Sequence, residues 1–388
     1  MFSVLQRPYR SYLASNKVCT VSRFSSVVSL TLVSLLTFHF SLFLSIKSPQ
    51  MLSLICTQPG ELEYKEVEKP PLQQGHALLK IKRIGICGTD LHAYEGTQPY
   101  FNYPRVLGHE LAAEIIEIDG SDEFAAGEAV TIIPYLNCGK CVACRNGKTN
   151  CCANIKVCGV HVDGGMAEYF SVPVEYIIHG NGLSYDELAL VEPLAIGAHG
   201  IRRADVKPGE FVLIIGAGPI GLGLMEFVRI AGAEVIAMDI NEKRLAFCKE
   251  QLKVHHTINA ATENVTEKLS MITNNDMPTV VIDATGNRNA MIKAFGYMAH
   301  GARYVLVGLQ KEELIFSHPE FHKREATLMS SRNATKADFA YVMQCMKQGS
   351  VTPSTYITHR TEFNKIKNEF DGWLNPANGV IKAMVEME

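Results

Sequence analysis

A glycine-rich turn in the middle of the chain limits the possible folds more than any other feature. The segment GAGPIG, residues 216–221, follows the apolar run FVLII and leads into the helical sequence IGLGLMEFVRIAG. A turn of this type between a buried strand and a helix lets a dinucleotide pyrophosphate approach the backbone at the helix N-terminus. Asp239 ends the next apolar run, where a carboxylate can bind the adenosine ribose and repel a 2′-phosphate. The predicted site therefore binds NAD and contains Gly216, Gly218, Gly221 and Asp239.

The segments on either side of this turn predict two kinds of domain. After it, apolar runs such as TVVIDATG alternate with helical segments such as NEKRLAFCKEQL, which is typical of a doubly wound parallel sheet. Before it, short β-like runs such as ELAAEIIEI are separated by Gly and Pro and predict a β-rich, barrel-like domain. The predicted fold class is α/β, with the β-rich domain over residues 51–194, the nucleotide-binding domain over 195–329 and a helical and mixed segment over 330–388.

Cysteines cluster in a short polar loop. Of the eleven cysteines, five fall between positions 138 and 152. In a chain of this length such clustering favours a metal site over disulfides. Four thiolates at this spacing can converge on one zinc ion and close the site to substrate. We expect a structural zinc bound by Cys138, Cys141, Cys144 and one of the adjacent pair Cys151 and Cys152.

A second group of metal-binding side chains is dispersed along the chain and comprises Cys87 in GICGTD, His109 and Glu110 in LGHE, and Glu192 in VEPLA. Each has an ordinary explanation as a buried cysteine, a core histidine or a solvated acid. Together they form a three-ligand set that leaves one position open on zinc, which predicts catalysis. Glu110 is either a direct ligand or a carboxylate that exchanges with one.

The overall charge argues against a nucleic-acid partner. The chain has 37 Lys and Arg against 40 Asp and Glu, which are interspersed. A protein that binds phosphate backbones normally presents a basic surface. We expect a small polar alcohol as substrate and no nucleic acid.

The first 50 residues differ from the rest of the chain. They contain five Lys and Arg but no acid, and residues 27–46 form an uncharged run long enough to cross a bilayer as a helix. This segment is either a membrane anchor or the result of a start codon placed upstream of Met51. We favour the second interpretation and expect a cytoplasmic enzyme, with an enzyme anchored through residues 27–46 as the alternative.

Taken together, GICGTD, GHE, the cysteine loop, GAGPIG and Asp239 resemble the zinc-containing medium-chain dehydrogenase/reductase family over nearly all of residues 51–388. The resemblance implies a GroES-like catalytic domain interrupted by a Rossmann domain, with subunits paired through the Rossmann sheets as a dimer or tetramer. Family spacing also selects Cys152 as the fourth ligand of the structural zinc, so that each subunit would bind two zinc ions and NAD.

One departure from the family pattern narrows the substrate. Family alcohol dehydrogenases usually have a cysteine as the third catalytic ligand, whereas this chain has Glu192, as in sorbitol, threonine and sugar-acid dehydrogenases. The segment SRNAT, residues 331–335, is similar to the sugar-acid group, which is typified by L-galactonate and L-gulonate 5-dehydrogenases. Arg332 could bind a carboxylate or vicinal hydroxyls of the substrate, contact the cofactor pyrophosphate, or form a salt bridge.

The resemblance also assigns a proton path. Thr89 would take the alcohol proton and pass it through the nicotinamide ribose to His92, while Asp90 orients its neighbours. We expect an oxidoreductase of carbohydrate metabolism that transfers a hydride to NAD from a secondary alcohol of a polyol or sugar acid. The alternatives are an L-threonine 3-dehydrogenase-like enzyme and, outside enzymes, a membrane-anchored or inactive NAD-binding protein.

Overall fold

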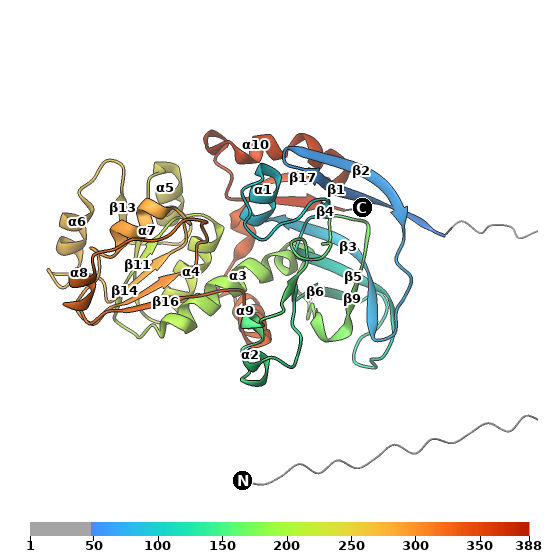
Figure 1. Ribbon diagram of the computed structural model, residues 1–388, viewed down its shortest axis with the longest axis horizontal. Helices are drawn as coiled ribbons and strands as arrows, with labels where there is room; N and C mark the ends of the chain where they lie inside the picture. Colours follow the sequence, from blue (N-terminus) through green and yellow to red (C-terminus); the bar gives the residue numbers. More distant parts are fainter. Residues whose placement is uncertain (1–47, 388) are drawn as a thin grey trace, which may run out of the picture. The chain divides into compact units, whose positions relative to one another are not determined.

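The computed structural model describes residues 48–387, and the ribbon in Figure 1 follows them through a β-rich region, a parallel sheet and a C-terminal return. The anchor predicted over residues 27–46, and the choice between anchor and misplaced start, lie outside the described residues. Within the described part of the chain, no helix combines the length and apolar character needed to cross a bilayer.

The β-rich region begins one residue before Met51 and is built mainly from antiparallel strands. Its strands are β1 Gln50–Gln58, β2 Glu61–Glu68, β3 His76–Ile86, β4 Arg105–Val106, β5 Glu110–Ile118, β6 Ala129–Ile132, β7 Tyr135–Leu136, β8 Lys156–Val157, β9 Tyr169–Pro173 and β10 Ile177–His179. Two helices interrupt it, α1 Gly88–Glu95 and α2 Val142–Arg145. The larger sheet has the order β10-β6-β5-β3-β18-β17, and β9 pairs with β3.

The C-terminal segment completes this sheet. It contains α9 Lys336–Lys347, β17 Ile357–Glu362, α10 Phe370–Leu374 and β18 Lys382–Glu386. Strand β18 runs antiparallel to β3, with Ala383 opposite Ile86, and β17 pairs with β18 on its other side. The C-terminal segment therefore belongs to the same domain as the β-rich region. This brings Lys382 next to a strand that lies about 300 residues earlier.

A six-stranded parallel sheet forms the second domain. Its strands are β11 Phe211–Ile215, β12 Glu234–Asp239, β13 His256–Asn259, β14 Val280–Asp283, β15 Arg303–Leu306 and β16 Thr327–Ser330, with α4 Pro219–Ile230, α5 Glu242–Glu250, α6 Val265–Ile272, α7 Arg288–Ala294 and α8 His318–His322 between them. The order β13-β12-β11-β14-β15-β16 is the order of dinucleotide-binding sheets. The predicted α/β fold is confirmed.

Alternate residues of these strands pack on opposite faces of the sheet. Val212 and Ile214 of β11 join the core shared with the β-rich domain, whereas Leu213 and Ile215 join a second apolar cluster. A strand that is buried on both faces has no polar positions. This explains why FVLII is apolar throughout.

Helix α3, Tyr185–Ala204, connects the two domains and is buried along most of its length. It begins with a capping box between Ser184 and Glu187, and it packs against β5, α4 and α9. The domain boundary expected at residue 194 falls inside this helix. Glu192 is thereby held on a rigid element between the two sheets.

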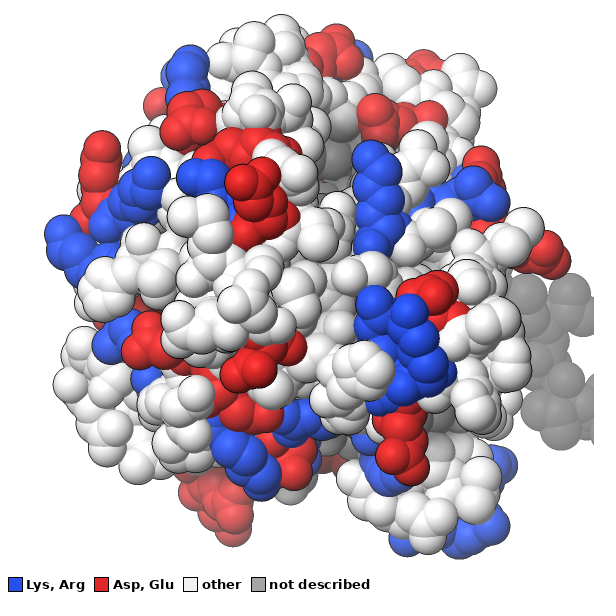
Figure 2. All heavy atoms as spheres, turned by 90° about the vertical axis from the view of Figure 1, so that its left-hand side faces the viewer, with Lys and Arg blue, Asp and Glu red and all other residues white. Residues whose placement is uncertain are grey.

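The face of the molecule in Figure 2 carries acidic and basic side chains next to one another, without a continuous basic surface. Ion pairs of the described residues include Arg303 with Glu210 and Lys323 with Glu320 at 2.7 Å. A mixed surface of this kind does not concentrate the positive potential on which phosphate-backbone binding depends.

Candidate active site and metal centres

The glycine-rich turn has the geometry that a bound pyrophosphate requires. Gly216 has φ of 102°, a left-handed conformation that side chains disfavour, and a Cβ at Gly221 would lie 1.8 Å from the Gly216 carbonyl oxygen. Gly218, the N-cap of α4, has no atom within 4 Å of its Cβ position. The outer two glycines therefore allow the turn and the close packing, while the middle one leaves open space at the helix N-terminus.

Asp239 lies directly beside this turn at the end of β12. Its carboxylate accepts hydrogen bonds from the backbone amides of Ala217 at 2.7 Å and Asn241 at 2.8 Å. A carboxylate has further lone pairs, so it can still accept hydrogen bonds from ribose hydroxyls. The structure thus brings Asp239 and the three glycines together, as the sequence predicts.

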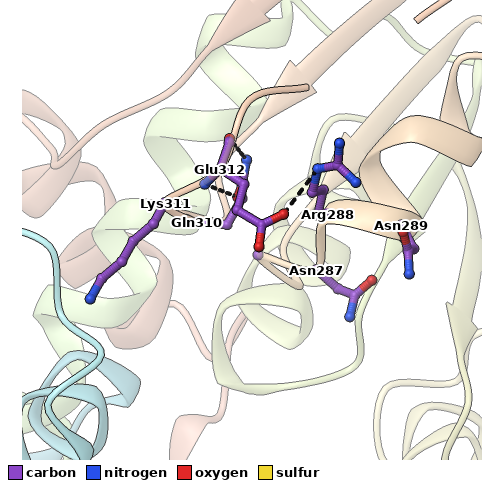
Figure 3. Close-up of a pocket in the computed structure, with 7 residues that line it drawn as sticks. Asn287, Arg288, Asn289, Gln310, Lys311 and Glu312 are labelled. Carbon is purple, nitrogen blue, oxygen red and sulfur yellow. Dashed lines mark hydrogen bonds and ion pairs between the residues drawn. The ribbon is translucent and has the colours of Figure 1, made fainter. Parts of the chain in front are cut away.

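A cavity of about 440 Å³ lies where the chain leaves β14 and β15, at the same edge of the sheet, and Figure 3 shows its lining. Arg288 forms an ion pair with Glu312 at 3.2 Å, and the side chain of Lys311 extends away from this pair. Ligands of doubly wound sheets bind beyond the carboxyl ends of the strands. The cavity therefore adjoins the cofactor edge and is distinct from the metal centres.

The cysteine loop gathers four sulfur atoms and leaves the fifth outside. The Sγ atoms of Cys138, Cys141, Cys144 and Cys152 all lie within 4.8 Å of one another, whereas Cys151 is exposed. Backbone amides of Lys140 and Cys141, together with Cys152, lower the pKa of Cys138 from 9.0 to about 6. These amides stabilise a thiolate, which is the form that binds zinc. The geometry and the donor set fit a closed tetrahedral zinc site.

The second cluster forms where β3 ends and β5 begins. Cys87 caps α1 directly after β3, Glu110 is the first residue of β5, and His109 directly precedes it. One ligand atom from each of these three residues lies within 4.8 Å of the other two. His109 is buried, and its Nδ1 atom has no hydrogen-bond partner in the described chain. Buried polar atoms are rarely unpaired, so this unsatisfied nitrogen and the neighbouring thiol fit a metal site.

Asp90 ties together the two turns that carry these ligands. It is fully buried, and its carboxylate accepts hydrogen bonds from the amides of Cys87 and Gly108, each at 3.0 Å. Its Oδ1 also lies 3.8 Å from Nδ1 of His109. Asp90 therefore orients both ligand-bearing turns, in agreement with the role expected for it.

A buried lysine, which the sequence analysis missed, pairs with Glu110. Nζ of Lys382 lies 2.6 Å from each carboxylate oxygen of Glu110 and 3.1 Å from the carbonyl oxygen of Ile86. Burial acts to lower the pKa of Lys382, but Glu110 and Cys87 raise it more, so the amine is charged. Gly85 makes room for this pair, because a Cβ there would lie 2.1 Å from a Glu110 oxygen. Glu110 thus has a partner of its own beside the metal ligands.

Glu192 lies next to this cluster, outside the group of three, and Tyr135 donates a hydrogen bond to it. Burial raises the pKa of Glu192 to about 7, because the effect of burial and of Glu110 exceeds the opposing effects of His109 and Tyr135. A cation placed beside a buried carboxylate stabilises its charged form.

The remaining predicted residues lie around helix α1 and the loop that follows it. Thr89 is half-buried in the first turn of α1, and His92, three residues later, is exposed with Nδ1 3.1 Å from Oγ1 of Thr97. The guanidinium of Arg332 lies 5.7 Å from the ring centroid of Tyr100. It forms no salt bridge or side-chain hydrogen bond among residues 48–387. Of the three interpretations of Arg332, the structure therefore disfavours a salt bridge within the protein.

Of the two residues that the sequence analysis missed, Lys382 and Tyr135, one left a signal in the sequence. Lys382 interrupts the apolar run VIKAMV, and a lysine in a buried strand needs a charged partner. Tyr135 directly precedes the cysteine loop, but nothing in its neighbours indicates that it reaches Glu192. The first could be suspected from the sequence, whereas the second depends on the fold.

The fold and the two donor clusters define a zinc-dependent dehydrogenase with a separate nucleotide-binding domain. Residues 73–181 match the alcohol dehydrogenase GroES-like domain and residues 219–348 match the zinc-binding dehydrogenase family. The chain belongs to the zinc-containing medium-chain dehydrogenase/reductase family and is a zinc-dependent, NAD-linked oxidoreductase acting on CH–OH groups.

The most informative relative is L-galactonate-5-dehydrogenase of Escherichia coli strain K12, which is 45% identical over 82% of this chain and 94% of its own length. Sorbitol dehydrogenase of Bacillus subtilis is 32% identical over 66% of this chain and 74% of its own. Among solved structures, the alcohol dehydrogenase RspB of E. coli CFT073, complexed with NADH, has a TM-score of 0.81 and 30% identity over 87% of this chain and 99% of its own.

Proposed function

We propose that this enzyme oxidises a secondary hydroxyl of a sugar acid, such as L-galactonate or L-gulonate, and transfers the hydride to NAD. The observation that carries the proposal is the guanidinium of Arg332, which lies beside Tyr100 of the loop that follows α1 and forms no salt bridge with any residue from 48 to 387. A guanidinium is suited to a carboxylate, because its planar donors match both oxygens. The 45% identity to an L-galactonate-5-dehydrogenase agrees with this assignment.

Cys87, His109 and a carboxylate from Glu192 or Glu110 would hold the catalytic zinc, which acts as a Lewis acid on the substrate oxygen. Thr89 would accept the alcohol proton, and His92, three residues later and exposed, would release it to water. These residues are spaced so that they lie on one face of α1. Cys138, Cys141, Cys144 and Cys152 would hold a second, structural zinc.

Asp239 supports NAD as the preferred cofactor, since a carboxylate at this position repels a 2′-phosphate. A structurally similar dehydrogenase from Sinorhizobium meliloti, with a TM-score of 0.80, is bound to NADP, so the preference needs a direct comparison of the two cofactors. We also propose a cytoplasmic homo-oligomer. Strand β16 lies at the edge of its sheet, with Leu328 exposed there, and the cysteine loop needs reduced thiols.

The test is growth of NADH absorbance with L-galactonate, L-gulonate, D-sorbitol and L-threonine, each with NAD and with NADP. We expect the highest kcat/KM with a sugar acid and NAD. L-threonine as the best substrate would instead establish the threonine dehydrogenase alternative. Light scattering and fractionation of the natural protein test the oligomer and its location.

A further inference from the structure

Asn150 connects the cysteine loop to the segment that carries Arg332. It lies between the third and fourth cysteine ligands and is buried, with 4% of its surface exposed. Its side-chain Nδ2 donates hydrogen bonds to the carbonyl oxygen of Arg332 at 2.9 Å and to Nε2 of His199 at 3.1 Å. The backbone carbonyl oxygen of Asn150 accepts a hydrogen bond from Nδ2 of Asn333 at 3.3 Å.

The chemistry of these contacts fixes the direction of each hydrogen bond. The carbonyl of Arg332 can only accept, so the amide group of Asn150 must present its NH₂ to it. Nε2 of His199 is then an acceptor, and its proton resides on Nδ1, which donates to Asp338 at 2.9 Å. Arg202 binds the same carboxylate at 2.8 Å with two nitrogens. In this orientation the NH₂ group of Asn150 is paired with both acceptors, the Arg332 carbonyl oxygen and Nε2 of His199.

The backbone around Arg332 depends on this network. Ser331 before it bonds to Leu306 at 2.9 Å, and Thr335 after it is fixed by Asp338 at the start of α9. Between them, Asn333 has φ of 53°, a left-handed conformation that asparagine adopts more readily than most residues other than glycine. Asn150 is the described residue that holds this turn from outside, because it bonds to both Arg332 and Asn333.

In Figure 1 the loop that carries α2 lies beside α9 and α3, where these contacts meet. We propose that Asn150 is a positioning residue, by which the cysteine loop sets the place of Arg332 and so the selectivity for substrates that carry a carboxylate. This inference rests on the proposed function, in which Arg332 binds the substrate acid. The cysteine loop would then contribute to specificity in addition to stability.

The experiment compares Asn150→Ala and Asn150→Asp with the matched control Asn146→Ala, which alters an exposed residue of the same loop that makes no side-chain hydrogen bond in the described chain. Steady-state kinetics use L-galactonate and the neutral D-sorbitol. We expect KM for L-galactonate to rise about tenfold in both Asn150 variants, as for one lost buried hydrogen bond, with kcat within about twofold. KM for D-sorbitol and the zinc content should be unchanged in the Asn150 variants. The control Asn146→Ala should have the KM values of the unaltered enzyme for both substrates.

Hydrogen exchange supplies a readout that does not depend on turnover. Amides of residues 331–335 should exchange faster in the Asn150 variants than in the unaltered enzyme, and Asn150→Ala should add nothing to KM in an Arg332→Ala background. Unchanged exchange, or equal KM changes for both substrates, would overturn the inference. If the unaltered enzyme oxidises no sugar acid, the proposed function fails, and the exchange comparison still decides whether Asn150 holds the Arg332 turn. An Asn150→Ala protein that loses zinc is replaced by Asn150→Asp, which preserves the shape of the side chain.

Discussion

The two metal centres of this enzyme are built in opposite ways. The four-cysteine site comes from one loop of fifteen residues, and three of its four cysteines are only partly buried. The Cys87 site draws on residues from four segments, the last of which is Lys382, and it is surrounded by buried charged groups that bond to one another. A loop of this kind depends on its metal for order, whereas a site held by paired buried groups depends on the fold.

This difference predicts that the cysteine loop contributes mainly to stability and the Cys87 site mainly to catalysis. Asp90 accepts hydrogen bonds from the amides of Cys87 and Gly108, and Lys382 bonds to Glu110, so the segments that carry the ligands are held by contacts that do not involve a metal. The catalytic cluster should therefore keep its shape when zinc is removed. The cysteine loop places four sulfur atoms close together, with 3.5 Å between Cys141 and Cys144. Burial and the neighbouring cysteines raise the pKa of Cys144 to about 12, so the four sulfurs need a metal ion to become thiolates together.

The largest expected effect follows from removing one catalytic ligand. Cys87→Ser should leave the fold and NAD binding intact while reducing kcat at least about a thousandfold, because zinc supplies several kcal/mol of charge stabilisation. Turnover, zinc content and the dissociation constant for NADH measure this directly. Near-normal turnover with full cofactor binding would show that Cys87 does not hold the catalytic zinc.

Removing a ligand from the cysteine loop should act on stability instead. Cys141→Ser should lower zinc content by about one ion per subunit and lower Tm by roughly 5 to 10 °C, with activity lost through unfolding. Cys151→Ser is the control, since this exposed cysteine lies outside the cluster. A stable Cys141→Ser enzyme with full zinc content would contradict the division between the two sites.

The same contrast explains how much of the molecule the sequence could predict. The cysteine loop and the glycine turn are local patterns, so their spacing alone indicated their chemistry. The partner of Glu110 could not be found this way, because Lys382 reaches it only when β18 pairs with β3. The hydrogen bond from Tyr135 to Glu192 likewise requires β7 and α3 to meet. Long-range contacts between elements, not residue type, decide these two interactions.

Lys382→Met tests whether paired charges hold the catalytic site. It leaves Glu110 buried without its partner, which should cost about 3 kcal/mol of stability and lower affinity at the catalytic zinc site roughly tenfold to a hundredfold. In the double variant Glu110→Gln/Lys382→Met the unpaired charge is gone, so stability should return while zinc affinity stays low. Thermal unfolding and zinc competition titrations distinguish the two effects. Equal loss of zinc from the cysteine loop would contradict a local role.

Tyr135→Phe gives the smallest and most specific test, because Tyr135 lies three residues before Cys138 and yet bonds to Glu192. Protons compete with zinc for this carboxylate, whose pKa is raised to about 7, so affinity at the catalytic site should fall as pH decreases through that range. Tyr135 stabilises the charged form and thus lowers this pKa. Its loss should move the fall in affinity upward by about half a pH unit, the size of one net hydrogen bond, and reduce kcat/KM about threefold near neutral pH.

Zinc in the cysteine loop provides the internal reference, since its retention should follow the same pH curve in both proteins. A parallel shift at both sites would mean that Tyr135 acts through the loop as a whole, and no shift at either would remove its hydrogen bond from the catalytic site.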